Sequence, residues 1–310
     1  MTRILLTGGA GYLGCVMVPR LLHRGWSVTV LDRFPHGAPF LAQSCIDPKF
    51  DIVRGDIRDL RVLSPLVKAA DVVINLAGIV GAPACDRDTE AAKSINEVAV
   101  RQIANMMTRG QMLLQPTSDS GYGVGYAADF CTEESPLNPV SLYGRTKVAA
   151  EKYVIGAGGV SLRLASVFGM SPRMRIDLMV NEFTWRAVHD RAVVLFEAHF
   201  RRNFIHIRDV VAAFLHAVDN YQAMRGQAFN CGLSSANMTK GQLAEKVKEH
   251  ISSFEIYLSE KGADPDRRDY VVSNAKLEAT GWQPQHNIDA GIRELIKGYR
   301  MIGKGAWFNA

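Results

Sequence analysis

Tyr143 and Lys147 stand four residues apart in a stretch with helical periodicity, so their side chains share one face of the predicted helix. A free tyrosine has a pKa of about 10 and is a poor base at neutral pH, but a neighbouring ammonium group favours the phenolate. Ser118 ends a predicted strand and can donate a hydrogen bond to a substrate oxygen while Tyr143 removes its proton. These residue types predict proton abstraction from a hydroxyl group.

A glycine-rich turn predicts a second component of the same site. Gly8, Gly11 and Gly14 directly follow the apolar run 3–7, and a helical pattern comes after them. Glycine permits a tight turn and lets the main chain approach a pyrophosphate closely, while the helix N-terminus offers unpaired N–H groups. The alternative is a glycine turn in a nucleotide-free protein, which the flanking strand and helix disfavour.

The end of the next predicted strand, 27–31, indicates which dinucleotide would bind. Asp32 ends this strand, and a carboxylate there accepts hydrogen bonds from both ribose hydroxyls and repels a 2′-phosphate. The neighbouring Arg33 is the one discordant residue, because an arginine can hold that phosphate. The pattern favours NAD over NADP.

These residues must be positioned by an alternating fold. Strand, glycine turn, helix and strand within about 30 residues form a βαβ unit with parallel pairing and a right-handed crossover. The alternation continues as strands 50–54, 71–76, 111–115 and 160–164 and helices 60–69, 91–109 and 142–154. The sequence therefore predicts an α/β fold with a doubly wound parallel sheet.

The regularity fades after Phe168. Further strands are expected at 204–207 and 228–230, and helices at 178–189, 210–221, 240–250 and 288–301. We expect a dinucleotide-binding domain over 1–168 with later returns around 203–232, and a mainly substrate-binding lobe over 169–310.

Composition excludes several classes of protein. The 310 residues carry a net charge of +5, are 47% hydrophobic, and contain no block of like charges typical of a nucleic-acid-binding arm. The five cysteines have no close pairs, which predicts neither a disulfide framework nor a metal site. No apolar run reaches the roughly 18 residues of a membrane span. We expect a cytoplasmic protein with no nucleic-acid or membrane partner, whose histidines, including His206, pack or form hydrogen bonds.

Glycine turn, strand-end serine and Tyr-x-x-x-Lys together resemble the extended short-chain dehydrogenase/reductase family, which acts on nucleotide-diphosphate sugars. The resemblance covers essentially the whole chain. It is also carried by G-D-I at 55–57, N-L-A-G at 75–78, R-L-A-S-V-F-G at 163–169, R-N-F-I-H at 202–206 and G-W at 281–282. It implies a Rossmann-type sheet, a smaller C-terminal α/β lobe, NAD as cofactor, and a homodimer paired through the helices 91–109 and 142–154.

The resemblance also implies residue roles. Tyr143 is the base, Lys147 holds the nicotinamide ribose and tunes the tyrosine, and Ser118 orients the sugar hydroxyl. The residues implied at the cofactor are Gly8, Gly11, Tyr12, Leu13, Gly14, Asp32, Arg33, Asp56, Ile57, Leu76, Ala77, Gly78, Asn96, Tyr143 and Lys147. Those implied at the substrate are Ser118, Ser120, Arg173, Arg175, Asn181, Arg202 and Arg268.

The substrate-side assignments have structural alternatives. Arginine forks suit the two phosphates of a nucleotide sugar, and Arg202 and Arg268 are the diphosphate candidates. Arg173 and Arg175 are candidates for the sugar or the nucleotide. A solvated surface role is the alternative for each arginine, and a cap or turn role is equally good for Asn181.

The residues after Ser118 bear on the reaction type. Relatives that are 4,6-dehydratases carry Asp-Glu after the catalytic threonine, whereas this chain has Asp119-Ser120, which disfavours elimination. Further segments, including 171–177 and 264–270, resemble bacterial GDP-D-glycero-D-manno-heptose 4-dehydrogenases of capsule synthesis. The resemblance thus implies oxidation at C4 of a nucleotide sugar, with a GDP-sugar favoured. A 4-epimerase is the alternative, and a non-catalytic dinucleotide-binding protein is a third reading.

Overall fold

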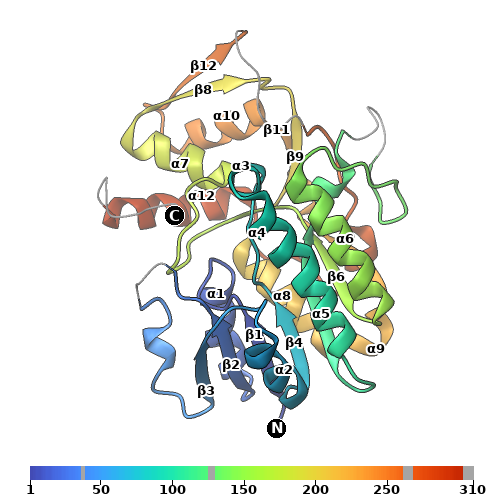
Figure 1. Ribbon diagram of the computed structural model, residues 1–310. Helices are drawn as coiled ribbons and strands as arrows, with labels where there is room; N and C mark the ends of the chain where they lie inside the picture. Colours follow the sequence, from blue (N-terminus) through green and yellow to red (C-terminus); the bar gives the residue numbers. More distant parts are fainter. Residues whose placement is uncertain (36–38, 125–129, 261–267, 303–310) are drawn as a thin grey trace.

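A seven-stranded parallel sheet forms the centre of the computed structural model, which describes residues 1–35, 39–124, 130–260 and 268–302 (Figure 1). Its spatial order is β10-β6-β5-β4-β1-β2-β3. The strands are β1 (Arg3–Thr7), β2 (Ser27–Asp32), β3 (Phe50–Arg54), β4 (Val72–Asn75), β5 (Met112–Ser118), β6 (Val160–Leu164) and β10 (Gln227–Cys231). Because the order reverses between β1 and β4, the carboxyl ends of these two strands border the switch point where ligands bind in such sheets.

Helices cover both faces of this sheet. Alternation along a strand sends Ile4 and Leu6 into one apolar core and Leu5 into another. The first core includes α1 (Gly14–His23) and α8 (Ile207–Asp219), and the second includes α2 (Leu60–Ala69), α5 (Ala99–Met106) and α6 (Leu142–Gly156). The predicted doubly wound α/β sheet is therefore confirmed.

A smaller lobe lies above the sheet in Figure 1. It has a three-stranded sheet of β7 (Ser166–Phe168), β9 (Arg201–His206) and β11 (Asn237–Thr239), and a two-stranded sheet of β8 (Ala192–Phe196) and β12 (Glu255–Ser259). Its main helices are α7 (Met179–His189), α10 (Lys240–His250) and α12 (Ile288–Met301), with a short α11 (Ala275–Glu278). The chain returns to the central sheet at β10, whereas β9 pairs within the lobe.

Some elements differ from the sequence prediction. The expected helix 91–109 consists of α4 (Thr89–Lys93), a π-helical turn (Ser94–Val98) and α5. The structure adds α3 (Ala82–Arg87) and α9 (Tyr221–Met224), and β8 pairs with β12 across about 60 residues of sequence. Short strand pairs of this kind depend on a partner strand far away in the sequence, which a local sequence pattern does not contain. Among the helices of the described residues, none combines the length and apolarity needed to cross a bilayer.

Candidate active site

Buried polar side chains link the central strands beneath the site. Asn75 Nδ2 donates to Gln115 Oε1 at 2.7 Å, and the Thr7 hydroxyl donates to Asn75 Oδ1. These bonds join β1, β4 and β5 near their carboxyl ends. The strand ends that carry the glycine turn and Ser118 are therefore held in one frame.

The glycine turn fits closely against the end of β4. Gly8 has φ +68°, and a Cβ placed on it would lie 2.6 Å from the Ala77 nitrogen, so only glycine suits this position. Leu13 precedes α1 without a side-chain cap, and the first turn of α1 contains no acidic residue. The N-terminus of α1 thus presents uncapped N–H groups and a positive dipole end, which fit a pyrophosphate.

The Asp32 carboxylate is oriented by the main chain of the same turn. Its Oδ2 accepts from the Ala10 nitrogen at 3.0 Å and its Oδ1 accepts from Phe34 at 2.8 Å. Each oxygen retains a further lone pair for a ribose hydroxyl. Arg33 is 59% exposed, and its Nε lies 3.8 Å from Asp56 Oδ2. This arrangement fits NAD better than NADP, because Arg33, the residue that could hold a 2′-phosphate, is ion-paired with Asp56.

Asp56, predicted at the cofactor, is engaged by a second arginine. Arg58 Nη2 lies 2.7 Å from Asp56 Oδ2, and this ion pair lowers the pKa of the carboxyl. Ile57 is buried beside it. The side chain of Asp56 is therefore held by Arg58 and Arg33, and it supports this corner of the site.

Tyr12 connects the glycine turn to the upper lobe. Its hydroxyl donates to the Gly169 carbonyl at 2.7 Å and accepts from Asn181 Nδ2 at 3.2 Å, and burial raises its pKa. The Ser171 hydroxyl donates to the Tyr12 carbonyl at 2.8 Å. Asn181 also donates to the Arg175 carbonyl and accepts from the Gly169 nitrogen. Both amide protons of Asn181 are bonded within the protein, so the turn-stabilising alternative describes this residue better than substrate contact.

Ser118 and Tyr143 are brought together from β5 and α6. Ser141 caps α6 by accepting from the Gly144 nitrogen at 3.1 Å, which places Tyr143 in the first turn. The Ser118 side chain is near enough to the Tyr143 hydroxyl to lower its pKa. Burial raises the pKa of Tyr143 to about 12, and the charges of Arg175 and Arg268 oppose this shift. Desolvation thus outweighs the nearby charges, and the tuning of Tyr143 by Lys147 stays a prediction.

Lys147 lies one helical turn beyond Tyr143. Its side chain is 5% exposed, and its Nζ donates to the Pro116 carbonyl at 3.3 Å. Nζ lies 5.8 Å from the centre of the Tyr143 ring. Burial lowers the pKa of Lys147 to about 8. The Pro116 carbonyl, which sequence reasoning missed, thus orients this ammonium.

Asn96 supports the loop after β4. Its Oδ1 accepts from the Ile79 nitrogen and its Nδ2 donates to the Ile79 carbonyl, both at 2.8 Å. A Cβ on Gly78 would meet Asn96 Oδ1 at 3.1 Å and Lys147 Nζ at 3.5 Å. Asn96, predicted at the cofactor, therefore acts here by fixing the main chain that carries Leu76, Ala77 and Gly78.

Two of the predicted substrate-side arginines lie near Tyr143. Arg175 and Arg268 are the cations whose charges lower the pKa of Tyr143. Arg175 Nε donates to Asp177 Oδ1 at 2.7 Å. Arg173 is buried and donates to the Met174 carbonyl. The structure thus brings Arg175 and Arg268 to the site, whereas Arg173 supports its own loop.

Arg202 and Ser120 are both buried. Arg202 donates to the carbonyls of Arg201 and Arg268, so it ties β9 to the segment that carries Arg268. The Ser120 nitrogen donates to Ser118 Oγ at 3.1 Å. Within the described part of the chain, the Ser120 hydroxyl has no hydrogen-bond partner. Ser120 therefore orients Ser118 through its main chain and keeps its own hydroxyl available.

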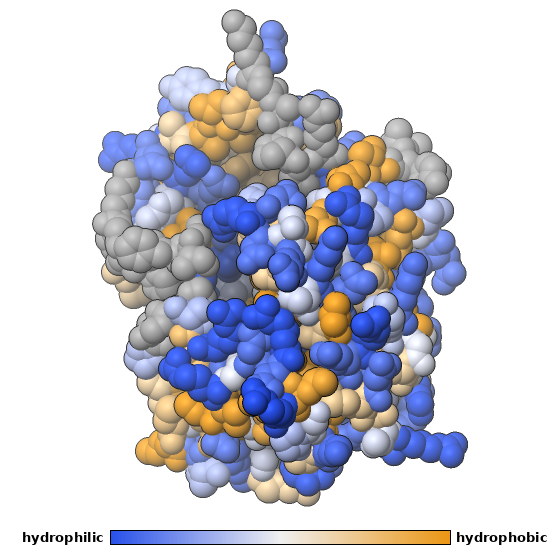
Figure 2. Space-filling view, in the orientation of Figure 1, coloured by the Kyte–Doolittle hydropathy of each residue, from blue (hydrophilic) through white to orange (hydrophobic). Residues whose placement is uncertain are grey.

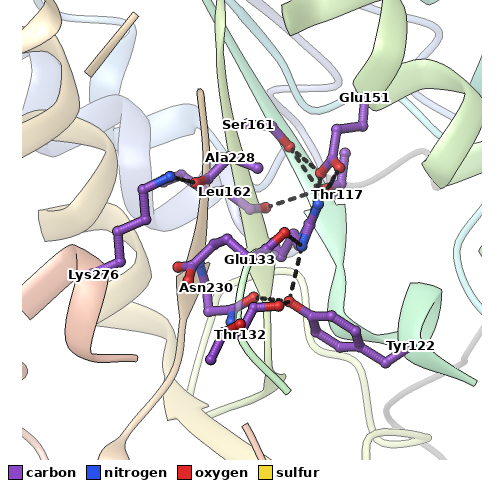
Figure 3. A network of polar contacts seen from close by, with 11 residues as sticks. Thr117, Tyr122, Thr132, Glu133, Glu151, Ser161, Leu162, Ala228, Asn230 and Lys276 are labelled. Atoms are coloured by element: carbon purple, nitrogen blue, oxygen red, sulfur yellow. Dashed lines mark hydrogen bonds and ion pairs between the residues drawn. The ribbon is translucent and has the colours of Figure 1, made fainter. Parts of the chain in front are cut away.

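A buried network, missed by the sequence analysis, joins β5, α6 and β6 (Figure 3). Glu151 Oε2 accepts from Thr117 at 3.0 Å and from Ser161 at 2.8 Å, and its carboxylate pairs with Arg163. Arg163 Nη1 donates to the Tyr122 hydroxyl at 2.9 Å. Glu151 is four residues beyond Lys147, and this helical spacing was the available signal.

His206 and His286 both form hydrogen bonds. His206 Nε2 lies 2.6 Å from Glu294 Oε2, and the rings of His206 and His286 are stacked with centroids 4.4 Å apart. His286 Nδ1 lies 2.8 Å from Asp209 Oδ1. All five cysteines are free thiols.

Hydrophilic residues gather at the middle of the face in Figure 2, between the sheet and the upper lobe. In Figure 1 this is where the carboxyl ends of the central strands meet the lobe, and residues from both parts contribute to the site. A charged or polar ligand matches the residues found here.

Comparisons with known proteins agree with this geometry. A low-salt glycan biosynthesis protein, Agl12, from Haloferax volcanii is 27% identical over 96% of this chain and 98% of its own length. A UDP-glucose 4-epimerase from Lactobacillus helveticus is 25% identical over 98% of each.

Solved structures share the fold. A dTDP-glucose 4,6-dehydratase from Bacillus anthracis in complex with NAD superposes with a TM-score of 0.84 at 19% identity, covering 99% of both chains. A UDP-glucuronic acid 4-epimerase from Bacillus cereus with UDP-glucuronic acid and NAD gives 0.83 at 21%, covering 97% of this chain and 99% of that one. The sequence pattern of the NAD dependent epimerase/dehydratase family matches residues 4–232. The chain therefore belongs to this family of enzymes, and NAD is its cofactor.

Proposed function

We propose that this enzyme oxidises the C4 hydroxyl of a nucleotide-diphosphate sugar to a 4-keto sugar. The observation that carries the proposal is the placement of Ser118, at the end of β5, near the Tyr143 hydroxyl, with Lys147 one turn further along the same helix. A GDP-manno-heptose is the substrate favoured by the resemblance in segments 171–177 and 264–270. We place the activity in the cytoplasm, since five free cysteines suit a reducing compartment.

In this proposal Tyr143 removes the proton of the C4 hydroxyl while Ser118 donates a hydrogen bond to the same oxygen. Bound NAD supplies the acceptor for the hydride from C4. The Lys147 ammonium holds the nicotinamide ribose, and the charges of Arg175 and Arg268 oppose the rise that burial causes in the pKa of Tyr143.

The residues after Ser118 support a reaction in which the sugar keeps its other hydroxyl groups. Elimination of water requires a base near C5, and the position two residues after Ser118 is occupied by Ser120. A neutral hydroxyl is a far weaker base than a carboxylate. The serine at position 120 therefore supports oxidation at C4 without elimination of water from the sugar.

A 4-epimerase is the second candidate, and the 25% identity to a UDP-glucose 4-epimerase favours it. An epimerase needs the same Ser118, Tyr143 and Lys147, but returns the hydride to the opposite face of the sugar. The two functions differ in their net redox change.

The test uses the purified chain with NAD and a panel of GDP-, UDP-, CDP- and dTDP-sugars. Thermal shift with NAD present selects the nucleotide, and absorbance at 340 nm with NMR of the sugar identifies the product. Net NADH with a 4-keto sugar supports the dehydrogenase, and an inverted C4 without net NADH supports the epimerase. A wild-type protein that binds NAD and converts no sugar in the panel would instead support the non-catalytic reading.

We also propose that the outward face of α6 packs against a second copy of the chain. A shallow groove there is lined by Pro139, Arg145, Val148, Ala149, Lys152 and Tyr153. The Arg101 guanidinium of α5 lies 5.9 Å from the Tyr153 ring centre, so the two helices form one continuous surface. Sedimentation of wild type and Val148→Glu tests this, because a charge in the groove separates a dimer into monomers.

A further inference from the structure

Tyr270 contacts the residue that follows Ser118. Its hydroxyl donates to Asp119 Oδ1 at 2.9 Å, and the two residues are 151 positions apart in the sequence. Both side chains are buried, with 0% and 2% exposure for Tyr270 and Asp119. A hydrogen bond to a buried carboxylate is among the stronger ones in proteins, because water does not compete for it.

The same tyrosine contacts the cations of the substrate lobe. The Arg202 guanidinium lies 5.7 Å from the centre of the Tyr270 ring, and Arg268 Nη1 donates to the Tyr270 hydroxyl at 3.4 Å. The ring also packs edge-on against Tyr122, with centroids 6.3 Å apart. Tyr270 is thus in contact with both predicted diphosphate-binding arginines and with the turn after β5.

The contact between Tyr270 and Asp119 affects Ser118 through the short turn Asp119–Tyr122. Asp119 lies between Ser118 and Ser120, and the Ser120 nitrogen donates to Ser118 Oγ at 3.1 Å. Displacement of Asp119 therefore changes the main-chain donor that orients the Ser118 hydroxyl. The Ser118 side chain in turn lies near the Tyr143 hydroxyl.

We propose that Tyr270 is a positioning residue, which holds Asp119 as a hydrogen-bond acceptor and so fixes Ser118 against Tyr143. The proposal rests on the proposed function and adds a residue to it. It also assigns Asp119 a role that needs no proton exchange with the sugar, because Oδ1 is directed at the tyrosine. Binding of the diphosphate at Arg202 and Arg268 is thereby connected to the orientation of the hydroxyl that contacts C4.

The test is a double-mutant cycle with Tyr270→Phe, Asp119→Ala and the combined variant, measured in kcat, KM and unfolding by urea. Tyr270→Phe keeps the ring against Arg202 and Tyr122 and removes only the donor. We expect kcat to fall about tenfold with KM changed less than about twofold. The combined variant is expected to be no slower than the worse single variant.

Asp119→Asn separates a role of Asp119 as hydrogen-bond acceptor from a role in proton exchange with the sugar. The asparagine amide oxygen still accepts from Tyr270, but the amide does not exchange a proton as a carboxylate does. We expect this variant to retain most of wild-type kcat. Tyr299→Phe is the matched control, since the Tyr299 hydroxyl is buried without a hydrogen-bond partner in the described residues. Its kcat should equal that of wild type.

The proposal would be overturned if Asp119→Asn were as slow as Asp119→Ala while Tyr270→Phe was unaffected. Additive effects of Tyr270→Phe and Asp119→Ala would overturn it as well. A rise in KM alone for Tyr270→Phe would assign the residue to phosphate binding and also overturn it. The unfolding cycle needs no substrate, so an absence of coupling there rejects the contact itself. Failure of the wild type to convert any sugar counts against the proposed function, while coupling in unfolding still supports the contact.

Discussion

Glu151 and Arg163 form an ion pair with Oε1 and Nη2 2.7 Å apart and with side chains 5% and 7% exposed. The same carboxylate accepts from Thr117, the residue before Ser118 (Figure 3). Glu151 lies on the helix of Tyr143 and Lys147, so a single carboxylate joins the catalytic helix to the strand that ends at Ser118.

Substitution of Glu151 by glutamine should destabilise the protein strongly. It leaves the Arg163 guanidinium buried without its counter-charge, which costs about 3–5 kcal/mol in the free energy of unfolding. Urea denaturation measures this. Glu182→Gln is the control, because Glu182 pairs with Arg186 at the surface of α7 and should change stability by less than about 0.5 kcal/mol. Equal losses in the free energy of unfolding for Glu151→Gln and Glu182→Gln would contradict the prediction that burial makes the Glu151–Arg163 pair the more important one.

Substitution of Tyr143 by phenylalanine should remove the base and leave the dinucleotide site intact. We expect turnover of the nucleotide sugar to fall by about 10²–10⁴-fold, the usual contribution of a positioned base. NAD affinity, measured by calorimetry, should stay within a few-fold of wild type. Tyr257→Phe, on the exposed strand β12, should leave both unchanged. Wild-type turnover in Tyr143→Phe would refute the assignment of Tyr143.

Lys147→Met should change stability in a pH-dependent way. Burial lowers the pKa of Lys147 from its usual 10.5 to about 8. Between these values the unfolded chain holds a proton that the folded chain has lost, so wild-type stability rises with pH across this window. Below pH 8 both states are protonated and the full cost of burying the charge remains.

Lys147→Met removes that cost. Without NAD, the variant should therefore be more stable than wild type at pH 7, by on the order of 2 kcal/mol. The difference should shrink as pH approaches 10. Lys68→Met, at an exposed position of α2, should show no such trend. A difference that stays constant from pH 7 to 10 would contradict the lowered pKa.

Gly8→Ala should disrupt the turn by contact as well as by backbone strain. Its Cβ would lie 2.6 Å from the Ala77 nitrogen, in addition to the cost of about 1–2 kcal/mol for a left-handed φ of +68°. Gly226→Ala isolates the strain, because φ there is +73° and no atom lies within 4 Å of the added Cβ. We expect Gly8→Ala to unfold at lower urea and to lose at least tenfold in NAD affinity, with Gly226→Ala retaining affinity. Equal behaviour would show that the close approach is unimportant.

The elements that depend on local spacing were predicted correctly. The bounds of β1, β3, α2 and β6 match the expected ranges, because apolar periodicity and glycine punctuation lie within a few residues of each other. The glycine turn, Asp32 and the shared face of Tyr143 and Lys147 follow from the same short windows. The roles of the individual site residues at cofactor and substrate remain predictions.

The contacts between distant segments were decided by the tertiary structure. Tyr270 meets Asp119 across 151 positions, and Tyr12 meets Gly169 across 157. No periodicity links such residues, because their distance depends on how every intervening element packs. The tertiary structure also decides the pKa values of Tyr143 and Lys147, because desolvation depends on every segment that surrounds the side chain. The sequence by itself determined which groups are present and on which element; packing determined how they meet and how strongly each holds its proton.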